Sequence, residues 1–116
     1  MVMEAHYFDA TTLDWVAHDR FPAIRVKVLE TRATHLLASV MLVRLAVGGE
    51  IVSHIHEIET ETAYVLSGTG ILTVENVTFV FAPSRGATIK PGCAHCLKNT
   101  GVTELELIAI HTPPTR

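Results

Sequence analysis

Residues 48–68, GGEIVSHIHEIETETAYVLSG, hold the most informative pattern in this chain. His54 and His56 stand two residues apart, and side chains at i and i+2 of a strand point to the same face. Glu61 opens a second apolar strand and could return its carboxylate to the same point. Two imidazoles and one carboxylate, with open positions left over, are typical of a divalent metal site that also binds substrate or oxygen.

A third histidine follows in residues 90–99, KPGCAHCLKN. The Pro-Gly pair predicts a turn, after which a strand would carry His95, Leu97 and Asn99 on one face. The histidines and Glu61 together favour a metal site over a set of unrelated surface and core residues.

The spacing in residues 48–68 resembles the first motif of the cupin family at every fixed position: Gly48, His54, His56, Glu61 and Gly68. The second cupin motif, about residues 84–99, is matched in part. Three of its fixed residues are present, namely Gly92, His95 and Asn99. Lys90 stands where a proline is usual, and Ser84 stands where the motif opens on glycine. The resemblance covers residues from about 36 to 111.

Membership of this family would imply an all-β jelly-roll barrel, also called a double-stranded β-helix. It implies one divalent transition metal (iron, manganese, nickel, copper or zinc) held by His54, His56, Glu61 and His95. Glu57 and Glu59 are rivals for the carboxylate role, but spacing favours Glu61. Small cupins include dioxygenases and isomerases, and the alternative is a non-catalytic binder or sensor of sugars or small molecules.

The strand pattern agrees with one small β domain at residues 24–116, preceded by an irregular arm at residues 1–23. Short runs rich in β-branched residues alternate with Gly, Asn and Pro, which is typical of a sandwich or barrel. We expect strands near 24–28, 35–47, 50–54, 61–67, 71–74, 77–81, 87–89, 95–99 and 103–111. A short helical turn around residues 12–16 could be capped by Asp9, Thr11 or Thr12.

Strand phase predicts a mostly apolar pocket around the metal, suited to a small organic ligand. If Glu104 and Glu106 face water, the alternate residues of the last strand face inward. The candidate pocket residues from all strands are Val52, Ala63, Val65, Cys93, Leu97, Asn99, Leu107 and His111. Arg44 is a further candidate, which inside a barrel could bind a substrate carboxylate through both guanidinium nitrogens. A surface position for Arg44 is the competing interpretation.

Cys93 and Cys96 flank His95 with the C-x-x-C spacing of redox or zinc sites. A redox pair of that kind usually opens a helix, whereas this one runs into a predicted strand. Two reduced thiols in a cytoplasmic protein are the simpler interpretation.

Composition excludes several classes of function. The net charge is −3 with no basic run, which argues against nucleic-acid binding. No apolar stretch approaches a transmembrane span, and the N-terminus lacks the pattern of a signal peptide. We expect a cytoplasmic protein that binds a small molecule. The arm carries Tyr7, Phe8, Trp15 and Phe21, which must cover the barrel or a partner, and the family resemblance implies a homodimer.

Overall fold

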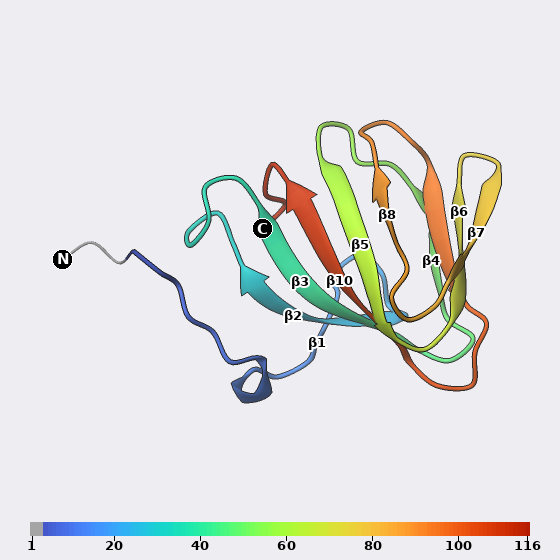
Figure 1. The fold of residues 1–116 in the computed structure, drawn as a ribbon, viewed down its shortest axis with the longest axis horizontal. Coiled ribbons are helices and arrows are strands. Elements are labelled where there is room, and N and C mark those ends of the chain that lie inside the picture. The colour runs from blue at the N-terminus through green and yellow to red at the C-terminus, as the bar shows by residue number, and fades with distance from the viewer. Residues whose placement is uncertain (1–3) are drawn as a thin grey trace.

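The computed structural model describes residues 4–116 and consists of two antiparallel β-sheets that face each other (Figure 1). A 3-10 turn, η1 (Ala10–Thr12), lies in the arm. The strands are β1 (Val16–Ala17), β2 (Ile24–Glu30), β3 (Ser39–Leu45), β4 (Glu50–His54), β5 (Thr60–Ser67), β6 (Gly70–Val74), β7 (Val77–Phe81), β8 (Gly86–Ile89), β9 (His95–Asn99) and β10 (Leu105–Thr112).

The larger sheet has the strand order β1-β2-β3-β10-β5-β8, and the smaller one has the order β4-β9-β6-β7. Strands far apart in sequence are neighbours, because β10 pairs with both β3 and β5, and β9 pairs with both β4 and β6. Along β3 and β10 every second residue is buried, as period-two alternation requires for a strand with one face on the core. The predicted all-β jelly-roll barrel is confirmed.

The core lies between the inner faces of the two sheets. Its most completely buried apolar side chains come from both layers, namely Val26, Leu45, Val65, Phe81 and Leu105. Burial of each such side chain is worth about 1.5–3 kcal/mol. The core therefore holds the sheets together and fixes the strand ends that carry the histidines.

A β-bulge in β4 sets which of its side chains face inward. Ile51 pairs with Leu97 and His54 pairs with His95, so three steps on β4 match two steps on β9. The extra residue lets both Ile51 and His54 face the barrel interior. Val52 instead faces outward and is 58% exposed.

The predicted strand at residues 35–47 is shorter than expected. His35 Nδ1 accepts hydrogen bonds from the backbone N–H groups of Leu37 and Ala38, at 3.1 Å each, which makes a turn. The strand then begins at Ser39. A histidine that accepts from its own backbone competes with strand pairing, and periodicity does not reveal this.

The arm packs partly on its own barrel. The helical turn expected near residues 12–16 is the 3-10 turn η1 instead, and Asp9 caps it by accepting from Thr11 N at 2.9 Å. The side chain of Trp15 lies against the outer face of the larger sheet, and Phe21 is buried in the core. Tyr7 is 87% exposed, and Figure 1 shows the start of the arm running away from the barrel.

Candidate metal centre

Two cross-strand pairs, one from each sheet, bring the predicted ligands together. His54 on β4 is the register partner of His95 on β9, and their ring centroids are 4.2 Å apart. Glu61 on β5 is the register partner of His111 on β10. His56, just after β4, stands between the pairs, with its ring centroid 5.4 Å from that of His95 and 4.9 Å from that of His111.

Backbone carbonyls fix the orientation of two of these histidines. His54 Nδ1 lies 2.9 Å from the carbonyl oxygen of Val52, and His95 Nδ1 lies 2.9 Å from that of Cys93. A ring nitrogen beside a carbonyl oxygen must carry the proton, so in each neutral ring Nε2 keeps its lone pair. Such a second hydrogen bond is the usual way in which proteins orient a metal-ligating imidazole.

The Pro-Gly turn of the second motif is tied to the first motif. Gly92 N donates to the carbonyl oxygen of His56 at 2.8 Å, and Gly92 has a φ of +82°. Glycine adopts this left-handed conformation without steric cost, whereas a residue with Cβ is strained there. The turn thereby holds the backbone of His56 beside the start of β9.

Glu61 is the acidic member of the cluster and has a strong partner. His111 Nε2 lies 2.7 Å from Glu61 Oε1, while His56 Nε2 lies 3.3 Å from the same oxygen and His95 Nε2 lies 3.9 Å from Oε2. Burial alone would raise the pKa of Glu61. The hydrogen bond from His111, the close approach of His56, and the nearby charges of His111 and His95 outweigh burial and hold this pKa well below its usual range. Glu61 is therefore a carboxylate at neutral pH.

Several buried nitrogens of the cluster lack a protein partner. Among residues 4–116, His56 Nε2, His95 Nε2 and His111 Nδ1 are buried without an aligned hydrogen bond. An unpaired buried polar atom costs about 1–3 kcal/mol, so each such atom calls for an explanation. Coordination of a cation by these nitrogens would remove that cost, and the donor set of imidazoles plus one carboxylate fits a divalent transition metal.

The cluster offers two overlapping groups of ligand atoms. In His54, His56 and His95 the ligand atoms all lie within 4.8 Å of one another, and the same holds for His56, Glu61 and His111. The predicted set of His54, His56, Glu61 and His95 is thus divided between two groups that share His56. His111, expected only as a polar group at the rim, belongs to the cluster itself.

A cavity of about 80 Å³ lies beside the cluster, between the two sheets. Its walls are mostly apolar, with the metal-centre residues as a polar patch. The apolar part is lined by Phe21, Ile24, Met41, Val43, Ile51, Ala63, Leu72, Phe81, Leu97, Leu107 and Ala109. The predicted pocket residues Ala63, Leu97, Leu107 and His111 all line it.

Two residues expected in the pocket lie on outer surfaces. Arg44 faces outward on β3, donates through Nε to Glu106 Oε1 at 2.7 Å, and stacks on Trp15 with its Cζ 4.2 Å from the ring centroid. Its competing interpretation as a surface residue is therefore the one that the structure supports. Val52 faces outward because of the bulge in β4.

Three further expected pocket residues also lie outside the cavity lining. Val65 has inward phase but is enclosed in the core, and Cys93 is half-buried against that core. Asn99 is buried and structural, since its Nδ2 donates to the carbonyl oxygens of Leu45 at 3.0 Å and Thr103 at 2.9 Å. Its Oδ1 accepts from Gly101 N at 2.9 Å. This side chain joins β9 to the end of β3 and to the loop before β10, which is a structural role.

Sequence reasoning missed two lining residues from the arm, His18 and Phe21. The Phe21 ring packs on that of His54, with centroids 4.8 Å apart. The arm reaches the cavity because β1 pairs with β2, at Val16 with Val26 and Ala17 with Arg25. A strand of two residues leaves no periodic signal, so the pattern of the arm could not have revealed this wall.

Comparisons with known proteins agree with the fold. The chain is similar to KdgF from Halomonas sp., with a TM-score of 0.83, 18% identity and coverage of 94% of each chain. It is similar to a predicted oxalate decarboxylase from Thermotoga maritima, with a TM-score of 0.84, 21% identity, and coverage of 92% of this chain and 98% of the other.

A curated relative matches over a shorter stretch. Mannose-1-phosphate guanylyltransferase of Escherichia coli is 32% identical over 65 residues, which are 56% of this chain but only 14% of that protein. Within residues 4–116 no helix has the length and apolarity needed to cross a bilayer. The sequence profile described as "Cupin domain" matches residues 41–111, more than half of the chain, and the protein therefore belongs to the cupin family.

Proposed function

We propose that this chain is a metal-dependent enzyme, of dioxygenase or isomerase type, that acts on a small organic molecule inside the barrel. The observation that carries the proposal is the convergence of His54, His56 and His95 in the wall of an apolar cavity, with the unpaired Nε2 atoms of His56 and His95 buried there. Two solved structures of similar fold are named as a predicted oxalate decarboxylase and an oxalate decarboxylase, which supports small organic molecules as substrates.

The residues of the cluster have distinct tasks in this proposal. The imidazoles of His54, His56 and His95 would hold the ion, and the carbonyls of Val52 and Cys93 keep two of those rings in the ligating tautomer. Glu61 offsets the charge of the cation, and His111 positions the carboxylate. A bound ion would supply Lewis acidity toward a substrate oxygen, or a site for O2 if it is iron or manganese. The apolar walls exclude water from the reacting end.

Metal analysis tests the proposal first. Untagged protein should carry about one first-row divalent ion per chain, and a chelator should lower the melting temperature. A ligand at a hundred times its dissociation constant stabilises the folded state by about 2.7 kcal/mol. His54→Ala and His95→Ala should lose the ion and remain folded. A protein whose melting responds to none of iron, manganese, nickel, copper and zinc would refute the metal site.

Turnover separates an enzyme from a binder. Iron- or manganese-loaded protein should consume oxygen with a panel of small hydroxy acids, keto acids and diketones, or should convert one of them to an isomer visible by NMR. Saturable binding without either reaction would instead favour the non-catalytic binder.

We further propose that the protein is a cytoplasmic homodimer, the two thiols remaining reduced. The outer face of the larger sheet carries adjacent apolar side chains that no other described element covers fully. Register places Ile108 beside Leu42 and Tyr64, and Ile110 beside Val40. A second copy of the chain is the occupant that would bury this face by two-fold symmetry.

A further inference from the structure

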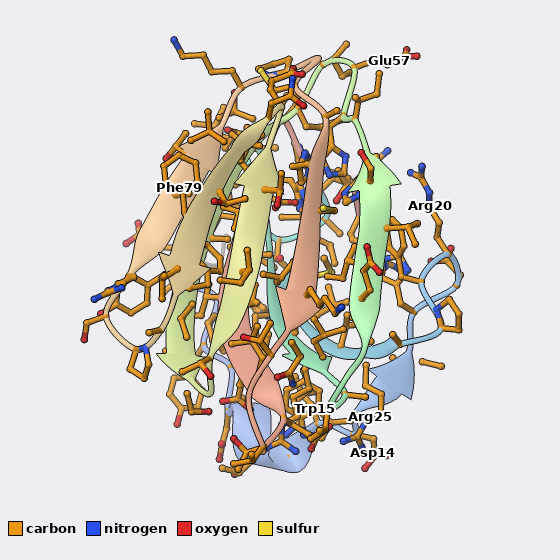
Figure 2. All side chains as sticks on the ribbon, turned by 90° about the vertical axis from the view of Figure 1, so that its right-hand side faces the viewer. Asp14, Trp15, Arg20, Arg25, Glu57 and Phe79 are labelled. Carbon is orange, nitrogen blue, oxygen red and sulfur yellow. The ribbon has the colours of Figure 1, made fainter. Side chains whose placement is uncertain are left out.

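The turn between β1 and β2, residues 18–23, forms one wall of the cavity. Its two lining side chains are His18 and Phe21, whose ring centroids lie 5.1 Å apart. Phe21 also packs on His54 at the end of β4. Figure 2 shows this turn beside the end of β4, with Arg20 labelled on its outer side. The turn thus spans the side of the barrel where β2 of one sheet and β4 of the other are neighbours.

The backbone of the turn fixes the tautomer of His18. Its Nδ1 accepts hydrogen bonds from the N–H groups of Arg20 at 2.9 Å and Phe21 at 3.2 Å. A nitrogen that accepts from two donors carries a lone pair, so the proton of the neutral ring is on Nε2. Asp19 Oδ1 lies 3.3 Å from Nδ1, but Asp19 is 83% exposed and hydrated, and it does not displace two backbone donors.

The surroundings of His18 keep the ring neutral. The side chain is only 13% exposed, and this burial lowers the pKa of His18. The charges of Arg116, Arg20 and His111 lower the pKa further, and only Asp19 opposes them. His18 Nε2 makes no hydrogen bond within residues 4–116 and is not among their buried unpaired atoms, so its N–H is open to water or to a ligand.

The remaining walls of the cavity offer few other polar groups. No lysine or arginine is among its lining residues, and Glu61 is its single acid within the described chain. A phosphorylated or multiply anionic molecule would find no cationic side chain to pair with. The lining polar groups are the metal-centre cluster and, on the arm, His18.

We propose that His18 is a ligand-contacting residue whose Nε2–H donates to an oxygen of the molecule bound in the cavity. The inference deepens the proposed function and names the class of ligand. This ligand is a small molecule with one oxygen-bearing end at the histidine cluster, a second acceptor oxygen at His18, and an apolar remainder.

A matched pair of variants isolates the donor. His18→Asn keeps an acceptor, because an asparagine Oδ1 readily accepts from the N–H two residues ahead, but it removes the distant ring N–H. His18→Ala removes both. Arg20→Lys is the neighbouring control, since it keeps a positive charge near His18 and Phe21 on the outer side of the turn. His18→Asn should retain the wild-type metal stoichiometry and melting temperature, whereas His18→Ala should melt lower.

Two pairs of probes test the contact in zinc-loaded and metal-free protein. Each pair shares a 2-hydroxycarboxylate end and differs by one distal hydroxyl: glycerate against lactate, and 2,4-dihydroxybutyrate against 2-hydroxybutyrate. Wild-type and Arg20→Lys proteins should bind the member with the extra hydroxyl, in at least one pair, about fivefold more tightly, as one neutral hydrogen bond allows. His18→Asn should lose this preference. Absence of a preference in the wild type, or its survival in His18→Asn, would overturn the inference.

NMR of ¹⁵N-labelled imidazoles gives an independent result in the metal-free protein. The ring of His18 should carry its proton on Nε2, and that signal should shift when the preferred probe is added. A proton on Nδ1 would overturn the inference whatever the protein does with metal. Failure to bind any metal would refute the proposed function alone. The tautomer and probe measurements on metal-free protein would then still decide the role of His18.

Discussion

At the scale of single residues, Glu61 supplies the negative charge of the metal centre. Glu61→Gln keeps the shape of the side chain and removes the charge that offsets a cation. We expect metal affinity to fall at least about tenfold, which corresponds to about 1.4 kcal/mol. Isothermal titration with zinc or manganese would measure the change.

Glu57→Gln and Glu59→Gln are the matched controls, because both residues lie in the loop before β5. Their metal affinities should stay within about twofold of the wild type, as expected for surface charges screened by water. Equal losses of metal affinity in all three variants would mean that the general negative charge around the site, rather than ligation by Glu61, controls metal binding.

His18 also makes stability depend on pH. Burial, assisted by Arg116, Arg20 and His111 against Asp19, lowers the pKa of His18 below its ordinary value of 6.5 in the folded protein. In the unfolded chain His18 therefore binds a proton near pH 6.5, whereas in the folded protein it binds one only at lower pH. The folded state loses stability as the pH falls below about 6.5. The lowered pKa of Glu61 acts in the same direction at lower pH, below about 4.5.

The melting temperature of metal-free protein should accordingly fall between pH 7.5 and pH 5.5, and the fall should be smaller in His18→Asn. Calorimetry at low salt would measure both curves. A melting temperature that rises on acidification, or an equal fall in the variant, would contradict the stated environment of His18.

The residue scale also shows what a sequence can reveal. The types and spacing of His54, His56, Glu61 and His95 pointed to one place, because motif spacing encodes ligand geometry directly. The hydrogen bond from His111 to Glu61 was not foreseen, since it depends on the register of β5 against β10, which periodicity does not specify. Arg44 was ambiguous for the same reason, as either face of β3 was open to it.

At the scale of elements, Trp15 anchors the arm to the barrel. Its ring lies 4.9 Å from Lys27 Nζ and 4.2 Å from Arg44 Cζ, and Lys27 also donates to the carbonyl oxygen of Ala10 at 2.7 Å. Trp15→Ala should lower the free energy of unfolding by about 1–3 kcal/mol, from two cation–π contacts and lost burial. Urea unfolding followed by far-UV circular dichroism would measure it.

Val102→Ala is the control for this substitution, because Val102 is 94% exposed and its loss should change the unfolding free energy by less than about 0.5 kcal/mol. A Trp15→Ala protein as stable as this control would mean that the arm is held by a partner instead of by its own sheet.

Elements differ in how well the sequence predicts them. The hairpin of β6 and β7 was predicted, because β-branched runs flank the turn at Glu75-Asn76. The bulge in β4 was not predicted. It turns Val52 and Ser53 outward in succession, and a pair of small or apolar residues gives no sequence signal for a bulge. The arm was assigned to the outside of the barrel or to a partner, and its contribution to the cavity depends on a pairing of two residues.

At the scale of the whole molecule, exposed apolar groups occur on several surfaces, two of which are the start of the arm and the outer face of the larger sheet. The start of the arm carries Tyr7 away from the barrel, and the outer face of the larger sheet presents Tyr64 beside Ile108. Trp15 and Phe21 both contact their own barrel, which is one of the two surfaces that the sequence left open for the arm.

Ile108→Glu tests the proposed homodimer. Ile108 is half-buried on the outer face, so the charge should leave each barrel folded while it places two carboxylates in a two-fold interface. Loss of apolar burial costs about 2 kcal/mol per copy, and burial of unpaired charges costs more. Light scattering at micromolar concentration should give twice the chain mass for the wild type and the single-chain mass for the variant.

Val80→Glu is the control, because Val80 lies on the exposed edge strand β7 of the other sheet, and this variant should remain dimeric. A wild type of single-chain mass would refute the dimer, and a dimeric Ile108→Glu would move the interface to another surface.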